Sequence, residues 1–436
     1  MEQILGDNMA TQNLSDRLPT PDSTTLQGMN DVDSFEAQAE KTVVVNDNEN
    51  GLTYAEVSSG GGPPPRVTTN CSQSVQDMVD IYPLIQFGTT RGNYSIGTPR
   101  SGDNSFESGG TPPTGGGKFQ GAVLMNNNKV FAIPNSYNGT TYIYNPGTNS
   151  WEDGATPPSG SDKFSGGVML PNGKVFCVPF NYKNATYIYN PDTDTWEDGG
   201  TLPSGSYKFA AGVLLPNGKV FCVPNSYNGT TYIYNPDSNS WENGGSQPSG
   251  SSKFSGAVLM PNGKVFCVPY NYTGTSYIYN PDTNSFQTGG SQPSGTGKFR
   301  GGVLMPNGKV FCAPFSYNDT KFIYNPDSNS WENGATPPSG TNKFKGATLM
   351  TNGKVLCVPY SYTGTSYIYN PESNSWENGG TPPSSNNNFT GGVVMDNGKV
   401  FCAPFSYAGT DYIFHPEGSD EYPYGDWMLE PFFNKL

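Results

Sequence analysis

The chain is poor in histidine, in positive charge and in long apolar runs. His415 is its single histidine, 23 Lys and Arg stand against 37 Asp and Glu, and the formal net charge is −14. One histidine disfavours His-based metal sites and catalytic triads, and the acidic balance disfavours binding to a nucleic-acid backbone. The chain contains no stretch of about 20 apolar residues, so no membrane span is predicted. The first residues lack a basic segment followed by an apolar one, so no signal peptide is expected.

The composition favours short strands and tight turns. Hydrophobic residues make up only 33%, while Gly (55) and Pro (38) together provide about a fifth of the 436 residues. This mixture disfavours a helical bundle. The length allows two or three ordinary domains, or one large β domain with appendages.

A repeat of 45 residues occupies most of the chain. A Lys-Phe pair begins at Lys118, Lys163, Lys208, Lys253, Lys298 and Lys343, with Asn388-Phe389 in the seventh place. A second marker, the aromatic residue of an Asn-Ser-Trp-Glu-like segment, falls at Phe106, Trp151, Trp196, Trp241, Phe286, Trp331 and Trp376. Periods of 40 to 50 residues with strand-like content are typical of propeller blades. We therefore predict an all-β fold, a seven-bladed β-propeller over residues 105–419.

One repeat predicts four strands, which we name A to D in chain order. Strand A covers Lys163–Pro171, and Asn172-Gly173 is a strong signal for a tight hairpin turn. Strand B covers Lys174–Pro179, with side chains alternating between two faces. Strand C covers Ala185–Asn190, and strand D lies around Trp196.

The two ends of the repeat region predict how the ring closes. The region opens with a D strand at Ser105–Glu107 and ends with a C strand at Asp411–Phe414. Glu421 stands where the next Trp would fall, so the last copy has no D strand of its own. An N-terminal D strand that completes the last blade would remove the exposed edge.

The repeat resembles the blades of the kelch and galactose-oxidase family, which carry an NGK-type turn, a YxYNP-like segment and a Trp. The resemblance covers about 315 residues and implies the propeller architecture. The chain departs from the family after strand B, where the family's Gly-Gly is replaced by Pro179-Phe180, Pro224-Asn225 or Pro269-Tyr270. The copper site of galactose oxidase needs two histidines, so that chemistry is not expected here.

Residues outside the repeat form three further segments. Residues 1–57 contain an expected hairpin, Glu40–Asn46 paired with Gly51–Glu56. Residues 58–104 begin with a Gly/Pro-rich linker and contain one expected short helix, stopped by a proline. Residues 420–436 hold five aromatics, which we expect to dock on the propeller or on a neighbouring subunit.

The passage LPTPDSTT…EKTVVVNDNENGLTYAEV, residues 18–57 of the first segment, resembles a segment near the N-terminus of bacteriophage tail-fibre and other virion appendage proteins. The resemblance covers about 40 residues. It implies a virion protein made in the host cytoplasm without a signal peptide, with its N-terminal region held by other virion proteins. It also implies a homo-oligomer, or several copies in one particle.

Six of the seven cysteines occupy one position of strand B. They are Cys177, Cys222, Cys267, Cys312, Cys357 and Cys402, while Ala132 fills the position in the first copy and Cys71 stands apart. Equivalent positions of separate blades are too far apart for a disulfide, which needs Cα atoms within about 7 Å. We expect these cysteines to be small buried side chains in a protein made in a reducing compartment.

Enzymatic and metal-binding interpretations find little support in the sequence. A sialidase holds its substrate with three arginines, whereas the repeat region has only Arg300. A repeated acidic position occurs at Asp192, Asp237, Asp282, Asp327 and Glu372. Asp and Asn there favour a β-turn; calcium is the alternative, although the loop-closing acid of an EF-hand is missing. We predict no catalytic residue, no metal and no cofactor.

The loops of one propeller face supply the candidate ligand-binding residues. The B–C and D–A loops open on the same face. The B–C loops carry Tyr137, Tyr182, Tyr227, Tyr272, Tyr317, Tyr362 and Tyr407, and the D–A loops end at Lys118, Lys163, Lys208, Lys253, Lys298 and Lys343. Tyrosine suits carbohydrate, and lysines around the channel mouth would attract an anionic sugar or a phosphate. The alternative is that the tyrosines pack between blades and the lysines are solvated strand ends.

Taken together, these patterns predict a non-enzymatic virion appendage protein whose propeller binds a host-surface glycan or receptor. One alternative is a structural protein that decorates or cements the particle. Another is a kelch-like scaffold that binds proteins.

Overall fold

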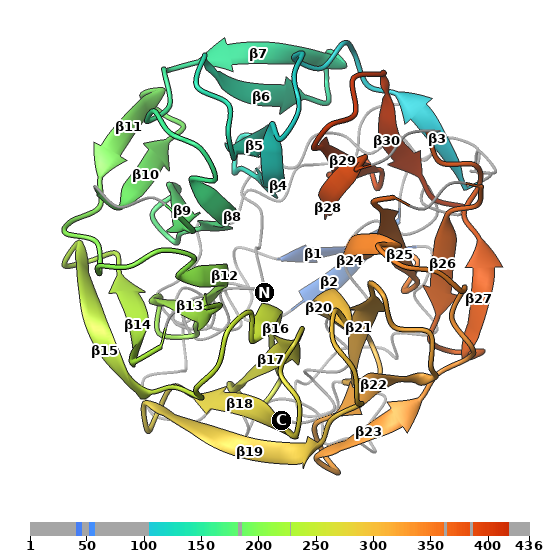
Figure 1. Cartoon of the computed structure of the whole chain (residues 1–436). Helices are drawn as coiled ribbons and strands as arrows, with labels where there is room; N and C mark the ends of the chain where they lie inside the picture. The colour runs from blue at the N-terminus through green and yellow to red at the C-terminus, as the bar shows by residue number, and fades with distance from the viewer. Residues whose placement is uncertain are drawn as a thin grey trace. The chain divides into compact units, whose positions relative to one another are not determined.

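The computed structural model is all β in the part of the chain that it describes. It describes residues 41–45, 52–56, 104–181, 185–226, 228–361, 364–383 and 387–417. Every element in these ranges is a β-strand. Seven four-stranded antiparallel sheets form a ring, with their first strands nearest the centre (Figure 1). The expected short helix, Cys71 and the tail 420–436 lie outside the described residues.

A separate two-stranded hairpin lies in the N-terminal region. Strand β1 (Lys41–Val45) pairs antiparallel with β2 (Leu52–Glu56), with Lys41 opposite Glu56. The structure thus has a hairpin where the sequence predicts one.

The seven blades repeat one strand order, in agreement with the sequence. The inner A strands are β4 (Phe119–Leu124), β8 (Phe164–Met169), β12 (Phe209–Leu214), β16 (Phe254–Leu259), β20 (Phe299–Leu304), β24 (Phe344–Leu349) and β28 (Phe389–Val394). The B strands are β5 (Val130–Pro134), β9 (Val175–Pro179), β13 (Val220–Pro224), β17 (Val265–Pro269), β21 (Val310–Pro314), β25 (Val355–Pro359) and β29 (Val400–Pro404).

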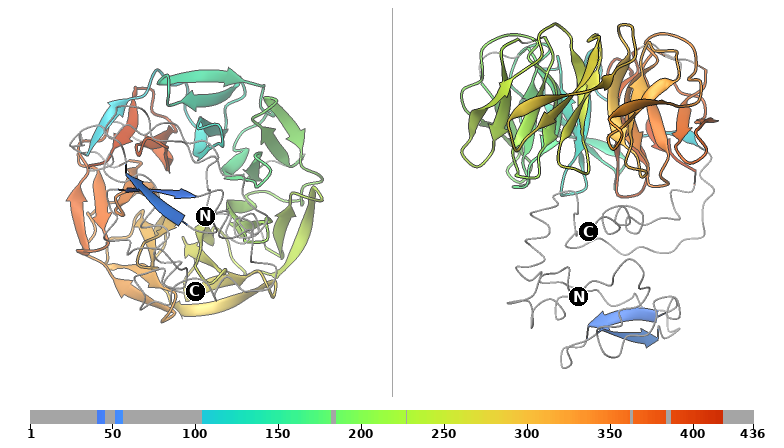
Figure 2. Two further views of the ribbon diagram at one scale, coloured as in Figure 1. Left: turned by 180° about the vertical axis from the view of Figure 1, so that it is seen from behind. Right: turned by 90° about the horizontal axis from the view of Figure 1, so that it is seen from below.

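The C and D strands lie farther from the axis, and the edge-on view of Figure 2 shows the blades side by side around it. The C strands are β6 (Thr141–Asn145), β10 (Tyr187–Asn190), β14 (Thr230–Asn235), β18 (Thr275–Asn280), β22 (Lys321–Asn325), β26 (Tyr367–Asn370) and β30 (Asp411–His415). The D strands are β7 (Ser150–Gly154), β11 (Thr195–Asp198), β15 (Ser240–Ser246), β19 (Ser285–Ser291), β23 (Ser330–Asn333), β27 (Ser375–Asn378) and β3 (Ser105–Ser108).

The ring closes as the sequence predicts. Strand β3 pairs antiparallel with β30 and completes the blade of β28, β29 and β30. The carboxylate of Glu107 on β3 accepts contacts from Lys399 Nζ and from His415 Nδ1, the latter at 2.9 Å. Burial raises the pKa of Glu107, but Lys399 and His415 lower it more, so it ends below its ordinary value. The first and last strands of the ring are therefore joined by backbone pairing and by charge.

Aromatic side chains hold neighbouring blades together. Phe131 of one blade stacks on Tyr189 of the next with ring centroids 4.5 Å apart. Trp196 stacks on Phe164 of its own blade and donates from Nε1 to Thr141 Oγ1 of the preceding blade at 2.9 Å. Because each B strand is covered by a blade on either face, all five of its residues are buried in every copy. This explains why strand B reads as a continuous apolar run.

The six cysteines of strand B are free and fully buried. Burial raises the pKa of these thiols above its ordinary value, as at Cys177 and Cys222. This agrees with the prediction that they are small core side chains.

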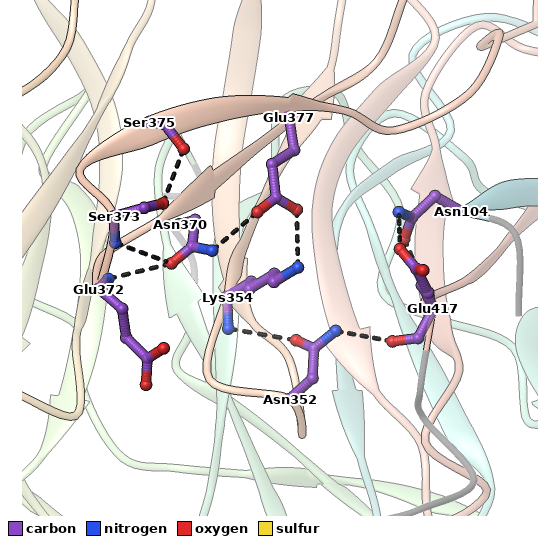
Figure 3. Close-up of polar contacts among 9 residues, drawn as sticks. All are labelled: Asn104, Asn352, Lys354, Asn370, Glu372, Ser373, Ser375, Glu377 and Glu417. Carbon is purple, nitrogen blue, oxygen red and sulfur yellow. Dashed lines mark hydrogen bonds and ion pairs between the residues drawn. The ribbon is translucent and has the colours of Figure 1, made fainter.

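The repeated Asn-Pro-Asp turn is built by the asparagine that ends strand C (Figure 3). Asn370 Oδ1 accepts the backbone N–H of Glu372 at 3.0 Å, and its amide donates to Glu377 at 2.7 Å. Glu377 also pairs with Lys354 at 2.7 Å. The β-turn interpretation is thus supported, but the side chain that bonds the turn backbone is the asparagine two residues before the repeated acidic position.

No helix in the described residues is long and apolar enough to cross a membrane.

Candidate functional site

The lysines expected at the channel mouth are buried instead. All six are fully inaccessible to solvent. The Nζ atom of Lys343 donates to Tyr317 O at 2.6 Å and to Asn318 Oδ1 at 2.7 Å, both in the B–C loop of the preceding blade. Burial lowers the pKa of five of these lysines to about 8, namely Lys118, Lys163, Lys253, Lys298 and Lys343.

The prediction of a solvent-facing ring of these ammonium groups was therefore wrong. The physical reason is that the carbonyl oxygens of the neighbouring B–C loop need donors, and a lysine side chain is long enough to reach them. In the seventh copy Asn388 replaces lysine, and its amide donates to Pro383 O at 2.9 Å.

Four of the loop tyrosines lie in described residues, and all four are half-buried. Tyr137 and Tyr272 each place their hydroxyl 3.0–3.1 Å from that of a strand C tyrosine. Tyr317 and Tyr407 pack on the strand A phenylalanines Phe299 and Phe389. Their contacts are those of packing, which was the alternative interpretation, and their role in binding stays a prediction. Tyr182, Tyr227 and Tyr362 lie outside the described residues.

A cavity of about 650 Å³ lies at the centre of the ring, toward the loop face. Its wall is formed by the inner A strands, by the ends of the B strands and by D–A loop residues such as Asp162, Tyr207 and Ser252. Its size is typical of sites for small molecules. We call it the axial pocket.

One position of strand A faces the axial pocket in every blade. It is the residue after the repeated phenylalanine: Gln120, Ser165, Ala210, Ser255, Arg300, Lys345 and Thr390. We call it the axial position. The A–B pairing shifts by one residue there, since Phe164 faces Pro179 while Gly167 faces Cys177. Such a bulge re-aims side chains.

The glycine after the axial position lets the inner strands approach each other. Gly346 has a φ of 130°, and a Cβ atom on it would lie 3.2 Å from Gly391 Cα of the next blade. Hydroxyl groups tie other pairs of inner strands, since Thr390 Oγ1 donates to Phe119 O and Ser255 Oγ donates to Phe299 O. The axial side chains therefore stand on a closely packed inner wall.

The two cationic axial residues lie on adjacent blades and beside aromatic rings. Arg300 Cζ lies 4.2 Å from the ring centre of Tyr270 and 5.1 Å from that of Phe315. Lys345 Nζ lies 4.4 Å from the ring centre of Phe405 and 4.9 Å from that of Tyr360. Such stacking is favourable for cations that have lost part of their hydration.

The aromatic partners form a partial belt at the position directly after strand B. Tyr270, Phe315, Tyr360 and Phe405 follow one another with ring centroids 6.2 Å apart. Asn135 and Asn225 occupy the same position in the first and third blades. The belt therefore covers the side of the ring that carries the two cations, while on the other side Phe180 stands between the two asparagines.

Tyr207 stands at the pocket in a strained conformation. It is 48% exposed and has a φ of 50°. The corresponding position before the repeated lysine is left-handed in each blade, with Gly117, Asp162, Ser252, Gly297, Asn342 and Asn387 in the other copies. Glycine, asparagine and aspartate tolerate that region, whereas a bulky side chain there is an outlier. Such strain is often found at functional sites.

Sequence reasoning missed the axial position and Tyr207. It concentrated on residues that recur in every copy, which turn out to be mostly structural. The pocket could have been found from the positions at which the nearly identical copies differ, rather than from the positions at which they agree. Within the described residues no three His, Cys, Asp or Glu side chains lie close enough to hold a metal ion.

Comparison with known proteins places the chain by fold alone. No known family model and no curated protein sequence matches it. Among solved structures, a catalytically inactive virginiamycin B lyase from Staphylococcus aureus with quinupristin is similar with a TM-score of 0.54 at 13% identity. The match covers 68% of this chain and 93% of the lyase.

Two extracellular domains from B. thetaiotaomicron are also similar. The extracellular domain of the system BT4673 matches with a TM-score of 0.52 and 14% sequence identity, over 71% of this chain. The extracellular domain of the system BT3049 matches with a TM-score of 0.51 and 9% sequence identity, over 70% of this chain. This chain spans about two fifths of each of those longer chains, 39% and 40%. Identities this low establish the shared fold and nothing more, so the chain is a seven-bladed β-propeller.

Proposed function

We propose that the protein is a non-enzymatic binding protein whose propeller takes a host-surface glycan in the axial pocket. One observation carries this proposal. The seven blades repeat the same residues where those residues build the fold, and they differ at the axial position, which faces the pocket in all seven blades. A purely structural wall would repeat the same residue, whereas a ligand without sevenfold symmetry needs different groups around it.

The chemistry of the wall suits a saccharide. Exposed Tyr207 and half-buried Tyr270 offer flat apolar faces, and the half-buried amide of Asn225 offers both a donor and an acceptor. Sugars bind through stacking on rings combined with hydrogen bonds from side chains of this kind.

Binding is favoured over catalysis by the groups available. The pocket wall includes one carboxylate, Asp162, and neither histidine nor cysteine. General acid–base catalysis on a glycoside commonly uses two carboxyl groups. The setting that we propose, a virion appendage held by its N-terminal region, is supported by the resemblance of residues 18–57 to tail-fibre segments.

The test is to fill the pocket without removing a ligand contact. Ala210 lies at the axial position, and Ala210→Trp would place a large ring in the cavity. A matched control is Thr283→Trp, which adds the same ring to an exposed turn on the opposite face. Both variants and the parent chain are compared for retention on host-cell envelopes and on a panel of immobilised oligosaccharides.

We expect Ala210→Trp to weaken retention at least tenfold and Thr283→Trp to leave it unchanged. Equal retention of all three proteins would place the ligand outside the pocket. Retention of none of them on any surface would overturn the binding function and favour a decorating or cementing role in a particle.

A further inference from the structure

Arg300 and Lys345 make one sector of the axial pocket strongly positive in a chain of net charge −14. They occupy the axial position of neighbouring inner strands, β20 and β24. The aromatic belt flanks both side chains, and both are half-buried. The two like charges repel each other, since the charge of Arg300 contributes to lowering the pKa of Lys345.

Neither cation forms an ion pair with a carboxylate of the described residues, although Asp162 acts on Lys345 from farther away. The Lys–Glu ion pairs of the blades use other lysines, those of the NGK turns. Lys345 Nζ has one hydrogen-bond acceptor, Gln120 Oε1 at 3.4 Å. Arg300 Nε is buried and has no hydrogen-bond partner. Asp162, the carboxylate of the wall, comes from the second blade, whereas the cations come from the fifth and sixth.

A buried donor without an acceptor costs free energy that a ligand can recover. A second orphaned group lies across the pocket, since Ser165 Oγ is also buried without a partner. The wall therefore offers a pair of cations on one side and an unused hydroxyl on the other.

We infer that the axial pocket is specific for an acidic saccharide, whose carboxylate or sulfate group is bound between Arg300 and Lys345. This rests on the proposed function and names its ligand class. The sugar ring lies along the aromatic belt, and its hydroxyls face the half-buried amide of Asn225. A free inorganic anion would use the cations alone and leave most of the 650 Å³ cavity to solvent.

Charge-neutral variants that the fold already accepts test this inference. Gln120 occupies the axial position in the first blade, so Arg300→Gln and Lys345→Gln should fold normally. The matched control is Lys264→Gln, which removes one positive charge from a turn on the opposite face, where the Lys264 ammonium group donates to Gln287 Oε1 at 3.0 Å. Each full-length protein is titrated with paired saccharides that differ only in charge.

Galacturonate oligomers, glucuronate oligomers and sialyllactose are each compared with their carboxyl-reduced forms. Sulfated galactose oligomers are compared with their desulfated forms. Inorganic sulfate is included as a further probe. We expect at least one acidic member to bind at least tenfold more tightly than its neutral partner. Arg300→Gln and Lys345→Gln should each abolish that preference, and Lys264→Gln should preserve it.

The outcomes separate this inference from the proposed function. Equal binding of acidic and neutral partners would overturn the acidic-ligand inference and leave glycan binding intact. Sulfate binding as tight as that of the acidic saccharides would assign the site to a free anion. Binding of no saccharide in any pair would overturn both.

Discussion

Tyr207 is the residue at which the repeat departs from what its backbone favours. Five of the six other blades place glycine, asparagine or aspartate at this left-handed position, and one places serine. Tyrosine there carries a backbone strain on the order of 1 kcal/mol. Its ring packs on Phe180, with centroids 5.3 Å apart, and remains 48% exposed at the pocket. A strained, exposed aromatic is best explained by a contact with the ligand.

Replacing Tyr207 with asparagine, which two other blades have at this position, should therefore increase stability and weaken binding. We expect Tyr207→Asn to raise the free energy of unfolding by about 1 kcal/mol and to weaken saccharide binding several-fold. Denaturant titration and equilibrium binding measure the two effects. The reverse change in another blade, Asn342→Tyr, should lower stability by a similar amount without improving binding. Unchanged binding by Tyr207→Asn would remove Tyr207 from the site.

Lys345 is the pocket group whose charge changes near neutral pH. Burial, helped by the charge of Arg300, lowers the pKa of its ammonium group to about 7, although Asp162 acts in the opposite direction. The other side chains that face it, Gln120 and the rings of Tyr360 and Phe405, carry no charge at this pH. Above pH 7 the free pocket therefore loses the positive charge of Lys345.

Affinity for an acidic saccharide should fall as pH rises through this range. A bound anion raises the pKa of Lys345, so the binding of an acidic saccharide above pH 7 is accompanied by the uptake of a proton. Because protons become scarcer as pH rises, the affinity for the saccharide falls. We expect a loss of about tenfold between pH 7 and pH 8.5, measured by calorimetry in buffers of different ionisation enthalpy. Lys345→Gln should bind weakly with a flat profile. A flat profile in the parent chain would contradict the assignment.

Among the elements, β3 is the strand on which closure of the ring depends. It is separated from β30 by about 300 residues in sequence, yet it supplies the outer strand of the last blade. Without it, the backbone groups of β30 would face solvent as an open edge, which invites pairing with other chains. The contacts of Glu107 with Lys399 and His415 would also be lost.

Two truncations separate the role of β3 from that of the residues before it. A chain that begins at residue 104 keeps β3, and we expect it to unfold at nearly the same denaturant concentration as the full chain. A chain that begins at residue 110 lacks β3 and should lose more than about 3 kcal/mol of stability and self-associate. Denaturant unfolding measures the stability of both truncations, and sedimentation measures their self-association. Equal stability of the two truncations would show that closure does not need this strand.

For the whole molecule, the architecture was predictable because it depends on periodicity. The spacing of Lys-Phe pairs gives the number of blades, and the positions of Ser105–Glu107 and Asp411–Phe414 give the phase of closure. Both features are spacings along the sequence, so they can be found without knowing any contact between blades. Strand B was also predictable, because Asn172-Gly173 fixes where it begins and Pro179 where it ends.

The candidate site was less predictable because it depends on contacts between blades. Whether Lys343 is exposed is decided by the carbonyls of a loop in the preceding blade, which no local pattern reveals. That the residue after each phenylalanine faces the axis depends on a one-residue shift in strand pairing. Only then do Arg300 and Lys345, forty-five residues apart, become neighbours in one pocket.

The most direct test of this account is a crystal structure of the full chain with the acidic saccharide that binds best in the paired panel. We predict its carboxylate or sulfate oxygens within hydrogen-bond distance of both Arg300 and Lys345, with the sugar ring against the aromatic belt of the axial pocket. A saccharide bound on the outer loops or on the opposite face, with the axial pocket free of ligand, would contradict the account.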